Sequence, residues 1–399
     1  MTMNVEFWHK VCFISLIILE SVHTFVFISR NSLSRNIIRS FSSSINQDPQ
    51  PSILAMPFAD LTENIGGSGR AKIVWDSIRK GEDPFDKNSN ILSNKAKNLL
   101  QQNIGSFSLL STDVISETPS SCGTRKFLQK LSDNQLVESV LIPSHKFERT
   151  TLCVSTQIGC DRGCAFCATG KMGLIRNLYT DEILSQVVHG LRISRREKLP
   201  MMTNIVFMGM GDAGRNPLSV SEAVLSLTDR LRFTFAQSKI TVSTVGPSPE
   251  IFHTLAKLPT TLAWSLHAAD DGLRKLLVPS TQHSTVELRD ALGEAMMTRS
   301  RARSRTLMIA VTLIDGINDH PEDATALAEF IKPLKEKCPK IALDLIPYND
   351  INIPAFKRPS NTKIDSFQKI LRDAGYFVSV RVTRGDEEAS ACGMLATKR

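Results

Sequence analysis

The sequence predicts a partial (β/α)6 barrel of the TIM type, preceded by a small accessory domain of helices and a β-hairpin. From Thr151 onward, apolar runs rich in β-branched residues alternate with helical stretches, which predicts parallel strands joined by crossover helices. Because the runs are apolar throughout, we expect both faces of each strand to be buried. Polar and reactive residues follow directly after the strands, where a barrel builds its active site.

Seven short strands and six helices account for the main domain. The expected strands cover 151–158, 203–209, 239–245, 261–267, 306–314, 341–347 and 377–383. The expected helices cover 180–195, 219–231, 248–257, 285–299, 321–337 and 361–373. A flat, doubly wound sheet would show the same alternation, and the polar residues after the strands are what favour the barrel.

A smaller region precedes these elements. Residues 48–60 contain three prolines and are expected to form a linker. Apolar residues over 70–80 have helical spacing, and Ser93 is placed to cap a second helix over 93–102. The segments 106–112 and 136–143 are richer in β formers and should make a small sheet or hairpin. The expected domains are therefore a targeting segment over 1–47, a linker and accessory domain over 48–143, and the main domain over 144–399.

The composition indicates a globular protein, because 42% of the residues are hydrophobic and 22% are charged. Residues 11–19 form an apolar run that is short for a membrane span and typical of a signal-peptide core. Residues 21–47 lack acids and place three arginines among serines, as transit peptides do. This two-part segment predicts delivery to a plastid, with a mitochondrion as the alternative. After its removal we expect a monomer without stable membrane association.

Three of the eight cysteines lie close together, at Cys160, Cys164 and Cys167, in a C-x3-C-x2-C pattern. Such spacing favours metal binding over a disulfide framework. An iron–sulfur cubane normally takes four thiolates, so three would leave one iron open to a substrate that the cluster can reduce. A closed zinc site with Cys153 as the fourth ligand is the alternative, although no second C-x2-C pair is present.

The C-x3-C-x2-C motif with an aromatic residue before its last cysteine resembles that of radical S-adenosylmethionine (SAM) enzymes. Longer strings narrow the resemblance: TLCVSTQIGC, FCATG, RNL, FMGMG, VSTVG, SLHA, LIPYN and TRGDEEASACG. They run in order from about Lys126 to Arg399 and resemble the RlmN/Cfr family of adenine-C2 RNA methyltransferases. The resemblance implies a methyltransferase acting on C2 of adenosine in large-subunit rRNA and in tRNA, and the sequence does not choose between these RNAs.

By this resemblance, Cys160, Cys164 and Cys167 hold one 4Fe–4S cluster that binds SAM through its free iron. The family's other cofactor contacts fall on Gly211, Asp212, Ser243, Ser265, Leu266, His267 and Asn349. The resemblance further implies two molecules of SAM per turnover and an electron donor such as a ferredoxin or flavodoxin. The family has GMGEP where this chain has GMGDAGRN, so Asp212 replaces a Glu and the Pro is missing. We expect a looser turn there and less certain placement of the cofactor.

The resemblance also assigns the catalytic residues Cys392, Cys153 and Glu138. Carbon 2 of adenine is electron-poor and cannot attack a methylsulfonium, so a radical route is needed. Cys392 would accept a methyl group from one SAM, and a radical derived from a second would activate that group for addition to adenine. Cys153 would then free the product by forming a disulfide with Cys392, while Glu138 accepts a proton. Without the resemblance, Cys153 would be interpreted as a small buried hydrophobe.

A net charge of +8 is compatible with an RNA partner, and basic residues gather in three places suited to phosphate contacts. These are Arg192, Arg195, Arg196 and Lys198; Arg299, Arg301, Arg303 and Arg305; and Lys357 with Arg358. Solvated helix ends are the alternative interpretation. Two other functions stay open: a radical SAM enzyme acting on a substrate other than RNA, which has no need for Cys153 and Cys392, and a non-catalytic RNA-binding assembly factor. A C8 methyltransferase of the same family is a closer variant.

Overall fold

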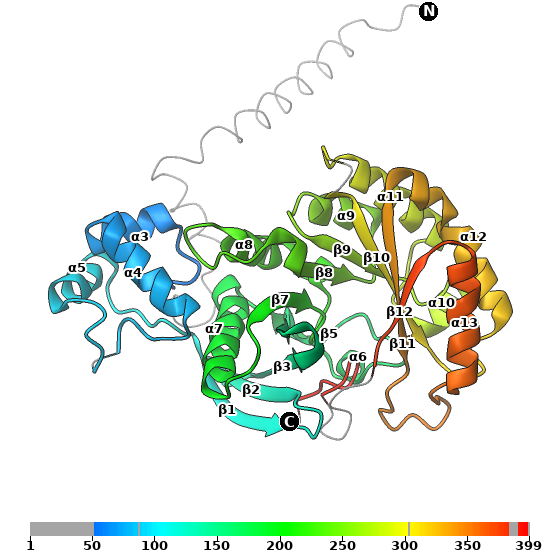
Figure 1. Cartoon of the computed structure of the whole chain (residues 1–399), viewed down its shortest axis with the longest axis horizontal. Helices are drawn as coiled ribbons and strands as arrows, with labels where there is room; N and C mark the ends of the chain where they lie inside the picture. Colours follow the sequence, from blue (N-terminus) through cyan, green and yellow to red (C-terminus); the bar gives the residue numbers. More distant parts are fainter. Residues whose placement is uncertain (1–51, 87, 302–303, 383–389, 398–399) are drawn as a thin grey trace, which may run out of the picture. The chain divides into compact units, whose positions relative to one another are not determined.

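The computed structural model describes residues 52–86, 88–301, 304–382 and 390–397 of the chain (Figure 1). Residues 50–399 form one compact unit. The expected targeting segment lies outside the described residues, so the plastid address stays a prediction. Among the helices that the structure describes, none combines the length and apolar character needed to cross a bilayer.

One ten-stranded sheet organises the described residues, with the order β1-β2-β3-β4-β7-β8-β9-β10-β11-β12. From β4 onward, each neighbouring pair is parallel. The parallel strands are β4 (Arg149–Cys153), β7 (Met202–Phe207), β8 (Ile240–Thr244), β9 (Thr261–Ser265), β10 (Thr306–Leu313), β11 (Lys340–Pro347) and β12 (Phe377–Val380). Their starts and ends agree closely with the predicted apolar runs, except for the first and the last.

Helices join these strands, as the alternation predicts (Figure 1). They are α7 (Thr180–Arg196), α8 (Pro217–Thr228), α9 (Pro249–Ala256), α10 (Asp271–Leu277), α11 (Thr285–Met297), α12 (Pro321–Lys337) and α13 (Asn361–Asp373). Local sequence explains where several begin. The hydroxyls of Ser284 and Ser360 accept hydrogen bonds from the first turns of α11 and α13, and proline opens α8, α9 and α12.

The parallel strands form a barrel-like wall, not a flat sheet. A single cavity is lined by Cys153 on β4, Ser243 on β8, Ile346 on β11 and Arg381 just after β12. Strands from the two ends of the parallel series can face one cavity only if the sheet curves around it. This curvature distinguishes the predicted partial barrel from the flat alternative.

The accessory residues extend the same sheet. β1 (Thr112–Pro119), β2 (Arg125–Leu131) and β3 (Leu136–Ser144) form antiparallel pairs, and β3 pairs antiparallel with β4. Hydrogen bonds therefore cross the boundary expected between residues 143 and 144. Three helices precede the strands: α3 (Phe58–Ile65), α4 (Ser68–Arg79) and α5 (Asn94–Ile104), the last capped by Ser93 as predicted.

Two expectations for this region were wrong. The proposed linker over 48–60 contains the start of α3, whose Leu61 and Ile65 lie one turn apart and are fully buried. The segment 106–112 is mostly irregular, and the first strand of the sheet begins only at Thr112. The strand was hard to predict because β1 is largely exposed and carries polar residues on both faces.

The expected strand 151–158 is broken in two. β4 ends at Cys153, and β5 (Gln157–Cys160) pairs with β6 (Gly173–Asn177) in a separate two-stranded sheet. Between them, the Ser155 amide donates to the side chain of Gln186 at 2.7 Å, and the Ser155 hydroxyl donates to the carbonyl oxygen of Glu138 at 2.6 Å. These buried hydrogen bonds to side chains replace the backbone hydrogen bonds that a continuous strand would form. The chain can therefore leave the sheet after β4 and carry Cys160 across the end of the sheet.

We predict that Gly159→Ala disrupts the β5–β6 pair. Gly159 has φ +74°, and a Cβ there would stand 1.8 Å from the carbonyl oxygen of Gly173. The left-handed backbone alone should cost about 1–2 kcal/mol, and the clash adds to that cost. Iron content per chain and the thermal unfolding midpoint should both fall. Gly69→Ala in α4 is the control, because a Cβ at Gly69 meets nothing within 4 Å; equal iron content in the two variants would contradict the prediction.

Candidate active site

A cavity of about 560 Å³ lies along the parallel strands and is lined both near their carboxyl ends, as at Cys153, and near their amino ends, as at Arg149. It brings together nearly all the residues singled out in the sequence. The predicted site residues that line it are Cys153, Cys160, Cys164, Cys167, Gly211, Asp212, Ser243, Ser265, His267, Asn349 and Cys392. Leu266 and Glu138 do not line it. The Leu266 side chain is fully buried in the core, and Glu138 faces the accessory strands.

The three clustered thiols lie at the end of β5, where Cys160 is the last residue, and on the short loop that follows it. The Cys167 amide donates to the carbonyl oxygen of Cys164 at 3.1 Å, and the Arg162 amide donates to the Cys160 sulfur at 3.4 Å. Gly170 in α6 (Ala168–Lys171) packs so closely that a Cβ would stand 2.9 Å from the Cys164 amide nitrogen. The loop is therefore tied down by its own backbone, with its three sulfurs facing one cavity.

Burial sets the protonation of these thiols. It raises the pKa of Cys160 to about 12 and raises the pKa values of Cys164 and Cys167 as well, and the neighbouring thiols add to the effect. Three thiols that line one cavity and repel one another's charge suit a bound cation, which would favour their thiolate forms. Among the described residues, no group of three His, Cys, Asp or Glu is arranged around a single metal ion. A cubane cluster does not require one, since each thiolate binds a different iron.

The carboxylate of Asp212 forms its hydrogen bonds with other groups of the protein. Its carboxylate accepts hydrogen bonds from the Gly214 amide at 2.6 Å, the Thr244 hydroxyl at 2.7 Å and the Val245 amide at 2.8 Å. Burial raises its pKa, while these donors act in the opposite direction. The turn is thus firmly tied to β8, and the expected loosening is not observed. Gly214 contributes to this fit, because a Cβ would stand 2.5 Å from the Thr244 hydroxyl oxygen.

The remaining polar residues present hydrogen-bonding groups to the cavity. The hydroxyls of Ser243 and Ser265 lie 3.1 Å apart on neighbouring strands. Nδ1 of His267 accepts a hydrogen bond from the Thr312 amide at 3.1 Å, so a neutral imidazole carries its proton on Nε2. Burial lowers the pKa of His267 to about 3, which keeps it neutral. These groups can recognise the polar parts of a small cofactor.

Cys392 reaches the cavity on a C-terminal strap, which we define as residues 390–397. The strap is anchored by two backbone carbonyls: Asn349 donates its side-chain N–H to Cys392 at 3.0 Å, and the Ala168 amide donates to Gly393 at 2.8 Å. The Ala396 amide donates to the Glu138 carboxylate at 2.9 Å, and Lys126 pairs with the same carboxylate at 3.1 Å. Glu138 therefore anchors the strap and does not face the cavity.

Cys153 and Cys392 line the same cavity as the cluster loop. Burial, reinforced by the neighbouring Cys392, raises the pKa of the Cys153 thiol to about 12. The seven cysteines that the structure describes are all free thiols. The arrangement accordingly shows the reduced form of this pair.

The basic clusters predicted from sequence are mostly used within the protein. Arg192 pairs with Asp83 at 3.2 Å, and Arg195 pairs with Glu82 at 2.6 Å, both acids coming from the accessory region. Arg299 donates to the carbonyl oxygens of Ala256 and nearby residues at the end of α9. Arg303 lies outside the described residues, and Lys357 and Arg358 are exposed. Internal pairing makes Arg192, Arg195 and Arg299 poor candidates for phosphate binding, and the role of the other members of these clusters stays a prediction.

The structure shows a further basic surface that the sequence analysis did not single out. Lys146, Phe147 and Arg149, which we call the Phe147 patch, lie at the turn between β3 and β4. The Phe147 ring is 61% exposed, with the Lys146 and Arg149 cations 5.5 Å and 5.2 Å from its centroid. Neither cation forms an ion pair with any described residue. Arg149 also lines the cavity, so the patch is continuous with the candidate active site.

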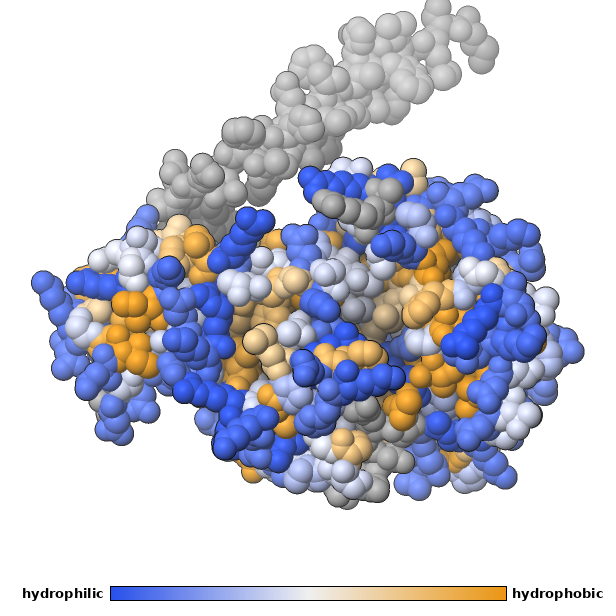
Figure 2. Space-filling view, in the orientation of Figure 1, coloured by the Kyte–Doolittle hydropathy of each residue, from blue (hydrophilic) through white to orange (hydrophobic). Residues whose placement is uncertain are grey.

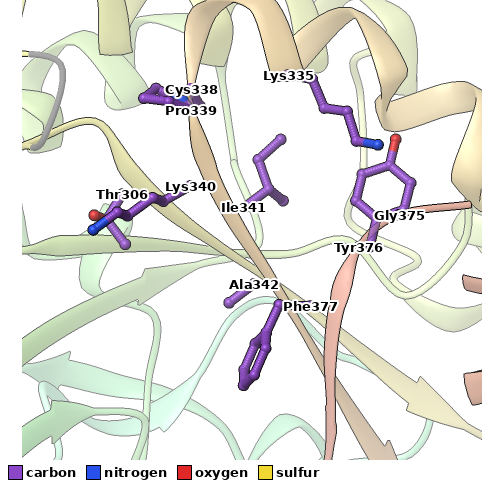
Figure 3. A pocket seen from close by; sticks show the side chains of 10 residues that line it. All are labelled: Thr306, Lys335, Cys338, Pro339, Lys340, Ile341, Ala342, Gly375, Tyr376 and Phe377. Atoms are coloured by element: carbon purple, nitrogen blue, oxygen red, sulfur yellow. The ribbon is translucent and has the colours of Figure 1, made fainter. Parts of the chain in front are cut away.

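A second cavity of about 700 Å³ lies at the amino ends of β10, β11 and β12 (Figure 3). None of the predicted site residues lines it. Lys335 points toward Tyr376, with its nitrogen 3.9 Å from the ring centroid, and donates to the Ala374 carbonyl at 3.0 Å. The opposite ends of the strands carry the reactive groups, as barrels generally arrange them.

Elsewhere, hydrophilic residues cover most of the viewed surface, and apolar residues reach it in separate patches (Figure 2).

Comparisons with known proteins agree with this site. Residues 154–331 match the radical SAM superfamily. The dual-specificity RNA methyltransferase RlmN of a Marinomonas species is 39% identical over 293 residues, which cover 71% of this chain and 76% of the relative. RlmN of Marinobacter nauticus is 36% identical, covering 86% of this chain and 92% of the relative. A crystal structure of a radical SAM methyltransferase from Sphaerobacter thermophilus matches with a TM-score of 0.74 at 32% identity, over 86% of this chain and 98% of that one.

We predict that Asp212→Asn lowers the free energy of unfolding by about 1–3 kcal/mol, because the amide nitrogen cannot accept a bond and leaves one buried donor unpaired. Urea unfolding measures the change. Asp350→Asn is the matched control: Asp350 accepts one hydrogen bond from the exposed Asn352 amide at 2.7 Å, which an amide oxygen accepts equally well. Equal stability of the two variants would show that the carboxylate does not tie the turn to β8.

Proposed function

The chain belongs to the RlmN family of radical SAM RNA methyltransferases, and on that premise we propose that it methylates C2 of adenosine in large-subunit rRNA, with tRNA as a second substrate. The observation that carries this proposal is the joint presence of five thiols in one cavity. Three of them suit a cluster, and two more, Cys153 and Cys392, are available for covalent chemistry. A radical enzyme that acts on another substrate has no need for the second pair.

Cys160, Cys164 and Cys167 would hold a 4Fe–4S cluster, and the hydroxyls of Ser243 and Ser265 with the Nε2–H of His267 would orient SAM. When bound, the cluster and two SAM molecules per turnover supply the methyl group, the electron transfer and the radical chemistry that an electron-poor carbon requires. A one-electron donor such as a flavodoxin or ferredoxin would reduce the site. Asp212, with its carboxylate already bonded three times within the protein, would shape the cofactor pocket more than it would bind the ammonium of SAM.

Each of the two remaining thiols would carry out one step of the reaction. Cys392 would accept the methyl group on its sulfur and carry it to the adenine. Cys153 would then attack that sulfur, so that an S–S bond forms while the bond from the Cys392 sulfur to the transferred carbon breaks. The electron pair of the broken bond stays with carbon, which takes up a proton and becomes the new methyl group. An external dithiol must reduce the disulfide before the next turnover.

The target adenosine has to leave its stack to reach this cavity, as bases do in other enzymes that modify them. The cavity volume of about 560 Å³ can admit a single base beside the cofactor. Phosphates on either side of that base would stay at the surface, where positively charged side chains without acidic partners attract them. The Phe147 patch offers such side chains and an exposed ring for base stacking.

The reconstituted enzyme, supplied anaerobically with SAM, a reductant and rRNA or tRNA fragments, should yield 2-methyladenosine by nucleoside mass spectrometry. Cys392→Ala should abolish the product while leaving the absorbance of the cluster intact, because the variant loses only the methyl acceptor. Cys122→Ala is the control, since Cys122 is exposed and outside the cavity. Formation of 8-methyladenosine would reject C2, and SAM cleavage without RNA modification would reject the RNA substrate.

We expect Lys146→Gln/Arg149→Gln to weaken RNA binding and to reduce the slope of log Kd against log salt by about 1.5, because two phosphate contacts are lost. Fluorescence anisotropy at several salt concentrations measures both quantities. Lys332→Gln/Lys369→Gln removes the same charge from lysines that pair with Glu329 and Asp373, and should leave the slope unchanged. The same slope for both double variants would place the RNA elsewhere.

A further inference from the structure

Arg381 is a charged residue of the cavity to which sequence reasoning gave no role. It follows β12, and its amide donates to the Leu345 carbonyl at 2.8 Å, which continues the strand ladder. Its guanidinium lines the same cavity as Cys153 and Cys392. The side chain is 32% exposed.

Contacts with Asp344 and Met208 fix the orientation of the Arg381 guanidinium. One of its nitrogens, Nη2, donates to the Asp344 carboxylate on β11 and lies 3.7 Å from the Met208 sulfur. Asp344 in turn accepts a hydrogen bond from the Ser379 hydroxyl at 3.1 Å, on β12, the strand that Arg381 follows. Because Asp344 is nearly buried and engaged from two sides, it orients Arg381 and does not itself reach the reacting sulfurs.

The charged and titratable groups around Cys153 come from β3, from the strap and from the residue that follows β12. On β3, Glu138 is neutralised by Lys126, and on the strap Cys392 disfavours a second negative charge nearby. The Met208 amide beyond β7 donates to the Cys153 sulfur, and Arg381 is the cation that favours its ionised form. Burial opposes ionisation strongly, since it raises the pKa of Cys153 to about 12. A thiol in this setting needs a positive neighbour before it can attack.

We propose that Arg381, oriented by Asp344, is a positioning residue that stabilises the thiolate of Cys153 for attack on the sulfur of Cys392. The inference deepens the proposed function and rests on it for the identity of that step. In the step, Cys153 first loses its proton to solvent, and its sulfur forms the S–S bond with Cys392 while the bond from the Cys392 sulfur to the transferred carbon breaks. The two sulfurs are thereby oxidised, and the carbon is reduced because it takes the electron pair and then a proton. The guanidinium forms no covalent bond and stays charged throughout.

Alkylation of the cluster-loaded protein by iodoacetamide, quantified at Cys153 by peptide mass spectrometry across pH, tests the proposal directly. Arg381→Gln should slow alkylation of Cys153 roughly tenfold near neutral pH and displace its pH profile upward by about one unit. Arg381→Lys should restore most of the rate, because it keeps the charge. Alkylation of the exposed Cys122 in the same samples is the internal control and should not change.

A buried carboxylate left without its partner can destabilise the fold, so Arg381→Gln/Asp344→Asn removes both charges together. This variant should retain the cluster absorbance and show the same slow alkylation. An unchanged rate and pH profile at Cys153 in either variant would overturn the proposal.

The alkylation result does not depend on RNA. If wild-type enzyme forms no 2-methyladenosine, the proposed function fails, whereas the influence of Arg381 on Cys153 is measured independently. If wild-type enzyme does form it, Arg381→Gln should accumulate a covalent adduct between Cys392 and RNA, visible as a slower band under denaturing conditions. Normal release of product by the variant, with no adduct, would show that Arg381 does not assist this step.

Discussion

The site depends on the attachment of the C-terminal strap to the cysteine loop. The bond from the Ala168 amide to the Gly393 carbonyl joins a residue next to Cys167 with a residue next to Cys392. Asn349 holds the Cys392 carbonyl from the end of β11, and Glu138 holds the strap from the accessory strands. Three separate parts of the fold therefore converge on one short segment. Without these bonds, the curved sheet would still form, but it would enclose a cavity with four thiols and no acceptor.

Burial has two consequences at this site. It keeps the thiols protonated in the absence of a cation, because the low dielectric penalises their charged forms. It also makes each positive neighbour more effective than it would be in water. Both groups of thiols need a nearby positive charge to ionise. A cluster would supply it at Cys160, Cys164 and Cys167, and the guanidinium of Arg381 would supply it at Cys153. The two groups of thiols can thus share one cavity while their ionisation is governed separately.

Charge in the sequence does not show which basic residues are left without acidic partners in the fold. Arg192 and Arg195 look like a phosphate-binding cluster, yet their partners Asp83 and Glu82 are more than a hundred residues away in the chain. Lys146 and Arg149 stand on either side of Glu148 in the sequence, which does not show whether that acid neutralises either of them. Only the fold shows that the first pair is neutralised and that the second is not.

Local pattern alone determined the parallel strands, the helices with their serine and proline starts, and the order of the motifs. Each of these depends on neighbours along the chain, which the sequence displays directly. It also supplied the family resemblance, and with it the identity of the five thiols. The tertiary structure decided what depends on distant neighbours: that Glu138 anchors the strap, that Asp212 is tied to β8, and that Arg381 lines the same cavity as Cys153. These contacts join segments that are far apart in the sequence, and the folding that brings them together leaves no periodic trace in the sequence.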